Sequence, residues 1–142
     1  MGNDSFFKIG VISETVIELL GLPIEPGTPI YLGQSNITHM QSRHPEDYER
    51  YGSCIGEIIS SPDYVGINPS DGSIEYIKDF RVDNEYVKVA VRVSQRGTYF
   101  ARSLFTRNRS KIDRFIASGK LQPLTTRTSI EHNIYGKDNF ED

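Results

Sequence analysis

Alternating valines constrain the fold of this chain more than any other feature. They occupy every second position of one segment: Val87, Val89, Val91 and Val93. A period of two places these side chains on one face of a β-strand and the intervening residues on the other. Residues 85–94 are therefore predicted to form a strand with one face that needs a hydrophobic covering. The opposite face then presents Lys88, Ala90 and Arg92.

Turn signals on both sides of this strand predict three more strands. The predicted segments are 64–67, 73–80 and 98–107, and an Asp-Gly pair lies in the turn at residues 68–72. The links between them are short, and short links join antiparallel neighbours. Residues 63–107 are therefore predicted to form a four-stranded antiparallel β-meander.

Helical spacing of apolar residues appears before and after these strands. The predicted helices are 13–21, a segment that begins at Ser35 or Asn36, 45–60, and 111–118. Pro45 disfavours helical backbone at His44 but suits the first turn of a new helix, so we expect a break there. The predicted fold class is α+β, with N-terminal helices packed on the four-stranded meander and a C-terminal helix after it.

The length of 142 residues fits one domain. We expect a single α+β domain over residues 1–121, with its core in 36–120, and a polar C-terminal tail over 122–142. No apolar run approaches the roughly 20 residues that span a bilayer, and no secretory signal is apparent, so a cytoplasmic protein without a membrane partner is expected. Cys54 is the only cysteine. It is interpreted as a small hydrophobe, the alternative being a reactive thiol.

Charge is distributed unevenly along the chain. The net charge is −3, which argues against a nucleic-acid partner. Residues 88–120, however, contain nine bases and one acid, whereas residues 44–85 contain ten acids and three bases. A fold that gathers the basic segment on one surface could bind a polyanion. The alternative is that the two segments neutralise each other in surface ion pairs.

Two of the three histidines, His39 and His44, lie close together. On one continuous helix they would be about 140° apart and would not share a face. A break at His44 removes this constraint and could direct both imidazoles toward the sheet. The alternative is that both are ordinary polar residues near a helix boundary.

The runs HPEDYERYGSCIGEIISSPDYVGINPSDGSIEYIKDF and EYVKVAVRVSQRGTYFARSLF resemble a phage-associated nuclease group. It belongs to the superfamily of barnase, EndoU, the colicin tRNases and RelE. A histidine-proline helix start, a Pro-Asp-Tyr strand start and hairpins that end near a basic-polar strand carry the likeness, over roughly residues 36–120. The resemblance implies helices on a four-stranded sheet and RNA cleavage without metal. It also implies a site built from a helix histidine, His39 or His44, and from strand residues. The strand candidates are Lys78, Arg92, Arg102 and Ser103.

This chemistry suits the residue types. RNA cleavage through the 2′-hydroxyl needs a base, an acid for the leaving 5′-oxygen, and positive charge at the phosphate. Histidine suits the first two roles and arginine the third. Lys88, Arg102 and Arg107 are the expected substrate-binding residues. Arg102 and Ser103 are adjacent and point to opposite faces of a regular strand, so both can line one site only if a bulge intervenes.

Three further features bear on function. Glu75 is a possible general base or else a surface charge. Tyr99, Phe100 and Phe105 are core residues or else a stacking surface for bases. No His/Cys cluster has zinc spacing, so neither metal nor cofactor is expected.

Two functions remain open. The first is a metal-independent ribonuclease of phage or mobile-element origin, toxin-like, with RNA (tRNA among the candidates) as its partner. The second is a catalytically inactive binding protein on the same scaffold, an inhibitor or adaptor with a phage or host protein as partner. A protein inhibitor is a further candidate partner of the nuclease.

Overall fold

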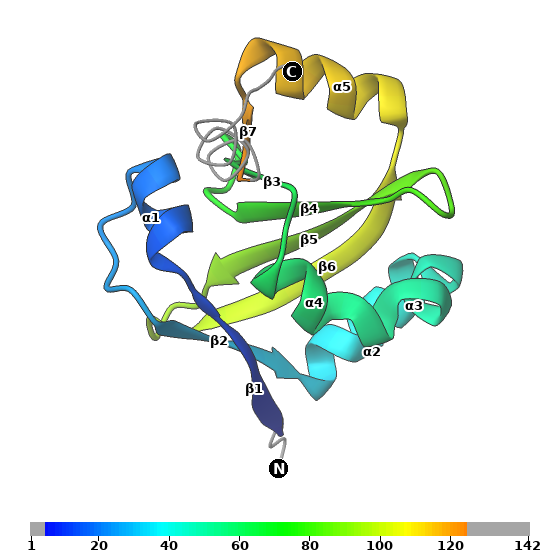
Figure 1. Cartoon of the computed structure of the whole chain (residues 1–142). Coiled ribbons are helices and arrows are strands. Elements are labelled where there is room, and N and C mark those ends of the chain that lie inside the picture. The colour runs from blue at the N-terminus through cyan, green and yellow to red at the C-terminus, as the bar shows by residue number, and fades with distance from the viewer. Residues whose placement is uncertain (1–4, 125–142) are drawn as a thin grey trace.

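The computed structural model describes residues 5–124, which form a seven-stranded mixed sheet with helices around it (Figure 1). The order of strands is β1-β2-β6-β5-β4-β3-β7. The strands are β1 (Phe6–Ile12), β2 (Thr28–Gly33), β3 (Tyr64–Ile67), β4 (Ile74–Phe80), β5 (Glu85–Val93), β6 (Tyr99–Arg107) and β7 (Leu121–Pro123). The helices are α1 (Glu14–Leu20), α2 (Gln34–Arg43), α3 (Pro45–Tyr51), α4 (Ile55–Ser60) and α5 (Arg109–Ser118).

The predicted fold class is wrong. The sheet extends beyond the four strands predicted between residues 63 and 107, because β1, β2 and β7 add to it at both ends. β2 pairs with β6 in parallel, so the sheet is mixed, and the chain begins with a strand, with helices between later strands. Strand β1 was not predicted because the apolar residues of its sequence, FFKIGVI, do not alternate. The parallel pairing of β2 with β6 joins residues 30 and 99, and a contact at that separation produces no local periodicity in the sequence.

The helix predicted over 45–60 is interrupted. α3 ends at Tyr51, a 3-10 turn covers Gly52–Cys54, and α4 follows. The ring of Tyr48 packs on Gly52, where a Cβ atom would lie 2.8 Å from its Cζ atom. Glycine therefore allows the close approach that the interruption creates. The predicted break at His44 is present, since His44 has non-helical φ and ψ of −141° and 69° and Pro45 begins α3.

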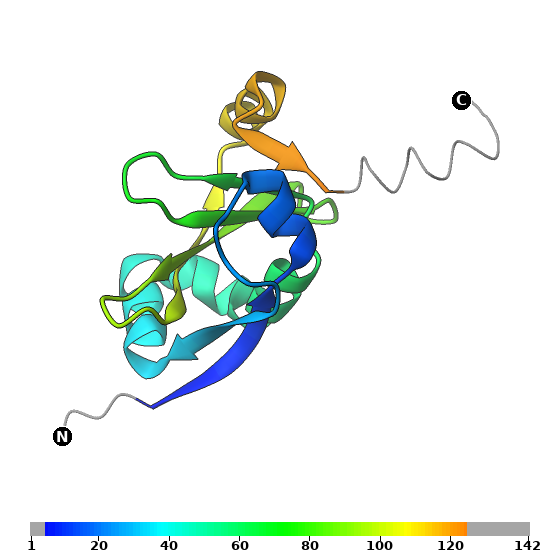
Figure 2. The ribbon, with the colours of Figure 1, turned by 90° about the vertical axis from the view of Figure 1, so that its left-hand side faces the viewer.

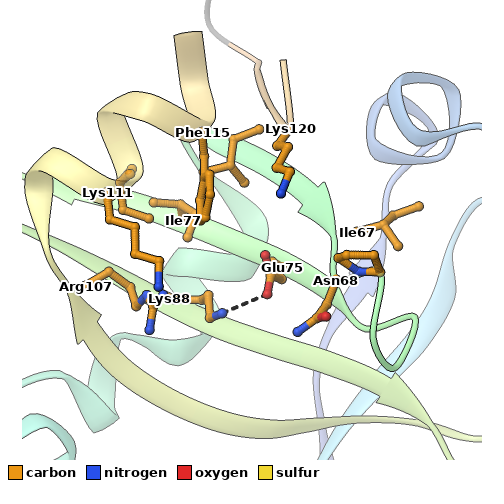
Figure 3. Close-up of a pocket in the computed structure, with 12 residues that line it drawn as sticks. Ile67, Asn68, Glu75, Ile77, Lys88, Arg107, Lys111, Phe115 and Lys120 are labelled. Carbon is orange, nitrogen blue, oxygen red and sulfur yellow. Dashed lines mark hydrogen bonds and ion pairs between the residues drawn. The ribbon is translucent and has the colours of Figure 1, made fainter. Parts of the chain in front are cut away.

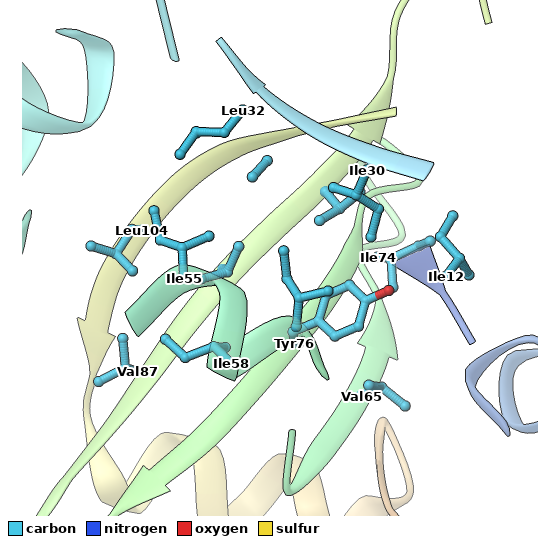
Figure 4. Close-up of a cluster of buried hydrophobic side chains, with 14 of the residues drawn as sticks. Ile12, Ile30, Leu32, Ile55, Ile58, Val65, Ile74, Tyr76, Val87 and Leu104 are labelled. Carbon is cyan, nitrogen blue, oxygen red and sulfur yellow. The ribbon is translucent and has the colours of Figure 1, made fainter. Parts of the chain in front are cut away.

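One face of the sheet carries the main hydrophobic core (Figure 4). Val87, Val89 and Val91 are fully buried there, as their alternation predicted. α4 covers them with Ile55 and Ile58, which are also buried. The apolar faces of the helices thus satisfy the requirement set by the valine face of β5.

The opposite face of the sheet is covered only in part. α5 packs over β4 and β5 in a smaller cluster formed by Ile77, Tyr86, Ile112 and Leu121. Figure 2 shows α5 and the group α2–α4 at opposite ends of the molecule, with the sheet between them. Asn108 caps α5 by accepting the N–H of Lys111 at 3.0 Å. Between these helical groups lies the polar face of β5.

α2 and α3 lie along the edge of β6 that no strand occupies after residue 100. The contact is polar as well as apolar: the carboxylate of Asp47 accepts the N–H of Thr106 at 3.0 Å. This carboxylate takes the place of the backbone acceptor that a neighbouring strand would offer to β6. The arrangement brings the residues of α2 beside those of β6, although they are about sixty positions apart in the chain.

Candidate functional site

A cavity of about 410 Å³ lies between α2, the β3–β4 turn and the polar face of β5 and β6. We call it the histidine–arginine pocket. Its lining residues come from four parts of the chain: Ser35, Asn36, His39, Asp71, Ser73, Ala90, Arg92, Arg102 and Ser103. Three of the residues predicted as catalytic, His39, Arg92 and Ser103, line this one cavity together with Arg102.

A β-bulge explains how Arg102 and Ser103 reach the same cavity. Ala90 is opposite Ser103, but its neighbour Val91 is opposite Ala101, so Arg102 is the extra residue in β6. Two core residues of β6, Ala101 and Leu104, are consequently three positions apart and both fully buried. The bulge was the condition under which both side chains could serve one site, and the structure meets it.

The two arginines give the pocket its charge. Nη1 of Arg92 lies 3.3 Å from Oδ2 of Asp71, in an ion pair whose side chains are each more than a third exposed. Arg102 has no carboxylate partner among residues 5–124. Burial and the neighbouring charge of Arg92 lower the pKa of Arg102, although Asp71 opposes the shift. Two guanidinium groups beside one exposed carboxylate favour a bound anion.

The first turn of α2 lines the pocket beside these arginines. The Oδ1 atom of Asn36 accepts the N–H of Gly33 at 2.9 Å, which fixes the start of the helix. The positive end of the helix macrodipole adds to the charge of the arginines. His39 follows one turn later on the exposed side of α2, whereas Met40 next to it is buried in the core.

The second predicted histidine lies further along the same edge of β6. The imidazole of His44 stacks on the ring of Phe105, with centroids 4.8 Å apart and planes at 22°. Nζ of Lys88 lies 5.0 Å and Cζ of Arg107 lies 5.3 Å from the centroid of that ring. We call these four residues the Phe105 cluster. It gathers the predicted residues that the histidine–arginine pocket leaves out, except Lys78.

Lys78 lies apart from both groups. Its register partner on β5 is Val87, whose side chain is in the main core, so Lys78 is on the sheet face that carries the main core and not on the polar face. Its Nζ atom donates to the carbonyl oxygen of Ser61 at 2.7 Å, next to the end of α4. The structure therefore does not bring Lys78 together with the other predicted residues.

Several lining residues were not anticipated from the sequence. Asp71 and Ser73 lie in the β3–β4 turn, but Asp71 was interpreted only as part of a turn signal and Ser73 only as the start of a strand. Ser35 and Asn36 were interpreted only as helix caps. Three aromatic residues also meet on this face beside Arg92: Phe6, Tyr31 and Phe100, with ring centroids 5.2–6.3 Å apart. Phe6 is 52% exposed. Phe100 was one of the predicted stacking candidates, and it lies opposite Arg92 in the sheet.

Other sequence features acquire no role at these sites. Cys54 is half-buried against the main core, as a small hydrophobe would be. Within residues 5–124 no group of three or more His, Cys, Asp or Glu side chains could hold a metal ion. In the same range no helix is long and apolar enough to cross a membrane. Most of the predicted C-terminal tail, including His132, lies outside the described residues.

Comparison with known protein families gives a match over most of the chain. The model of the family described as phage-Barnase-EndoU-ColicinE5/D-RelE like nuclease3 matches residues 7–114, which is most of the chain. The matched segment includes the predicted histidines and every strand residue that lines the histidine–arginine pocket. No curated protein and no solved structure matches the chain.

Proposed function

Because this chain belongs to the family of phage-Barnase-EndoU-ColicinE5/D-RelE like nucleases, we propose that it cleaves RNA in the histidine–arginine pocket without a metal ion. The observation that carries the proposal is the meeting of His39, Arg92, Arg102 and Ser103 in one cavity. These side chains come from a helix and two strands, and a bulge in β6 is needed to bring the last two together.

The arginines supply the charge that the reaction needs. In cleavage by transphosphorylation, the 2′-oxygen attacks the phosphorus, and the bond from phosphorus to the 5′-oxygen breaks. Negative charge grows on the nonbridging oxygens as the phosphorus becomes five-coordinate. Arg92 and Arg102 would hold these oxygens with paired N–H donors, and the hydroxyl of Ser103 would add a hydrogen bond.

Two protons move in this step, and two imidazoles are available on the edge of β6. His39 would take the proton of the 2′-hydroxyl, because it is the histidine that lines the pocket. His44, held against Phe105, would give a proton to the leaving 5′-oxygen. The products are a 2′,3′-cyclic phosphate and a 5′-hydroxyl, so atoms and charge balance with no other reactant.

The test is cleavage of single-stranded RNA in EDTA, with the 2′,3′-cyclic phosphate as the diagnostic product. His39→Ala should reduce the rate by about 10²–10⁴-fold, the usual contribution of general acid–base catalysis. Arg81→Ala is a matched control for Arg92→Ala, since its side chain is 89% exposed in the β4–β5 turn. Absence of any RNA cleavage by the wild-type protein would contradict the proposal.

The two proton-transfer roles can be separated chemically. An RNA with sulfur in place of the leaving 5′-oxygen needs no proton donor, because a thiolate is a good leaving group. His44→Ala should cleave this substrate nearly as well as the wild type, whereas His39→Ala should remain slow. Rescue of His39→Ala in place of His44→Ala would exchange the two roles.

A second function is favoured by a specific observation. In the described part of the chain no hydrogen bond orients the ring of His39, and Asp71 partly neutralises Arg92. Catalytic bases are commonly oriented by a third group. The alternative is therefore a binding protein on the nuclease scaffold, an inhibitor or adaptor. It predicts RNA or protein binding without cleavage under any of these conditions.

A further inference from the structure

A second cavity, of about 180 Å³, lies on the same sheet face beside α5 (Figure 3). We call it the α5 pocket. Its apolar wall includes Ile77 and Phe115, and four cations surround it: Lys88, Arg107, Lys111 and Lys120. Figure 3 shows the charged ends of Lys111 and Lys120 directed toward the Glu75–Lys88 pair.

The cations of the α5 pocket outnumber its acids. Glu75 is the one carboxylate among the described residues of the lining, and it pairs with Lys88 at 2.7 Å, with side chains only 15% and 12% exposed. Among residues 5–124, Arg107, Lys111 and Lys120 pair with no carboxylate. Nε of Arg107 is buried and has no hydrogen-bond acceptor within that range. A buried donor without an acceptor is costly, and an anion would supply the acceptor.

The volume of the cavity and its hydrogen-bond donors restrict the kind of anion that can bind. Oδ1 of Asn68 accepts the N–H of Ser70 at 2.8 Å, so its NH₂ group is left as a donor at the rim. The volume is below the roughly 300–1,000 Å³ of pockets for drug-sized ligands. The cavity therefore suits one phosphate with part of its nucleotide, held by Lys and Arg donors.

The α5 pocket adjoins the histidine–arginine pocket. Glu75 lies opposite Ala90, and Ala90 lies opposite Ser103, so one row of the sheet borders both cavities. Lys88 in one pocket and Arg92 in the other are four residues apart on β5, a span of about 13 Å. One flexible RNA strand can therefore occupy both cavities at once.

We propose that the α5 pocket is a subsite for a phosphate that flanks the cleaved one on the same RNA strand. The proposal rests on the proposed function for the identity of the ligand. The subsite contributes to binding, and the bond is broken in the histidine–arginine pocket. Lys111 and Lys120 are its substrate-binding residues on the α5 side, and Arg107 completes the phosphate contacts from β6.

The experiment compares Lys111→Ala/Lys120→Ala with Arg81→Ala/Arg114→Ala, a control that removes the same net charge from sites outside both pockets. Both pairs are made in the full chain and also in the His39→Ala background, which keeps RNA intact for binding. Binding of a labelled single strand of about twelve nucleotides is measured by anisotropy at several salt concentrations. Melting curves verify that each variant is folded.

The subsite predicts about tenfold weaker binding or more for the lysine pair, as expected for loss of charged hydrogen bonds. The slope of log K against log[salt] is negative, and its magnitude should be smaller by about 0.7 in the lysine pair. This is the value for one phosphate contact on a single strand. In the active background, KM should rise for the long RNA with little change in kcat. The preference for the long strand over a dinucleotide should also fall.

Equal binding and equal salt slopes in the two pairs would overturn the subsite. This result is distinguishable from failure of the proposed function, because the binding arm uses a variant that does not need to cleave. If the wild type cleaves no RNA but the lysine pair still loses affinity, the nuclease proposal fails and the phosphate subsite is supported.

Discussion

Two buried tyrosines offer a matched test of how hydrogen bonding stabilises this fold. The hydroxyl of Tyr76 is buried in the main core, has no partner among residues 5–124, and burial raises the pKa of this side chain (Figure 4). The hydroxyl of Tyr51 contacts Oδ2 of Asp83 at 2.8 Å and Oε1 of Glu85 at 2.6 Å. Substitution by phenylalanine removes the same oxygen at both positions and leaves no cavity larger than that atom.

The two substitutions should change the free energy of unfolding in opposite directions. An unsatisfied buried polar group costs about 1–3 kcal/mol, so Tyr76→Phe should raise the free energy of unfolding by about 1 kcal/mol. Hydrogen bonds to charged groups contribute about 1.5–3 kcal/mol. The side chains of Asp83 and Glu85 are 42% and 30% exposed and can recover water, so Tyr51→Phe should cost about 1.5 kcal/mol, at the lower end.

The assay is urea unfolding followed by far-UV circular dichroism, since the chain has no tryptophan. For a domain of this size, 1 kcal/mol corresponds to a shift of about 3–5 °C in Tm, which gives an independent measurement. The m value should be the same in all three proteins if the unfolded state is unchanged. Destabilisation by Tyr76→Phe comparable to that by Tyr51→Phe would refute the reasoning, because the Tyr76 hydroxyl would then have a partner in solution.

Three further predictions follow from single features of the fold. Hydrogen bonds from the Tyr51 hydroxyl and from an arginine lower the pKa of Glu85 below its ordinary value of 4.5. Its contribution to stability is therefore fully present above 4.5 and is lost as the pH falls through the lowered pKa, so the cost of Glu85→Gln should be largest at pH 7 and should shrink as the pH is lowered below 4.5, measured by urea unfolding. Gly66→Ala would place a Cβ atom 2.6 Å from the carbonyl oxygen of Lys120, so it should separate β3 from β7 and cost about 1–3 kcal/mol by thermal unfolding. Phe6→Ala removes an exposed ring that contacts Phe100; if bases stack there, RNA affinity by anisotropy should fall by about 1 kcal/mol or more, and an unchanged affinity would exclude stacking.

The residues show where local patterns determine structure and where they do not. Alternation placed Val89 in the core and Lys88 on the opposite face, because a strand buried on one side leaves a period of two in the sequence. Pro45 predicted the break at His44 through the geometry of its own ring. These are short-range effects, so the sequence alone was sufficient for them.

The features that were not predicted depend on distant contacts. The bulge at Arg102 leaves a trace only in the spacing of Ala101 and Leu104, two apolar residues three positions apart. Such spacing is equally typical of a helix, so the register with β5 is needed to interpret it. The position of His39 likewise depends on α2 lying beside β6, which follows from the parallel pairing of β2 with that strand.

The distribution of ion pairs explains how a chain of net charge −3 can present a cationic face. Acids of the segment 44–85 pair largely outside the histidine–arginine pocket: Asp79 holds Arg109 at 3.2 Å, and Glu85 holds Arg50 at 2.7 Å. Both pairs lie at the end of the sheet near the β4–β5 turn. On this face the two segments neutralise each other only in part. Asp71 pairs with Arg92 and Glu75 pairs with Lys88, whereas Arg102 and Arg107 are left without a carboxylate in the described range. Net charge averages over the whole surface, whereas a phosphate responds to the charges within about 10 Å at 0.1 M salt.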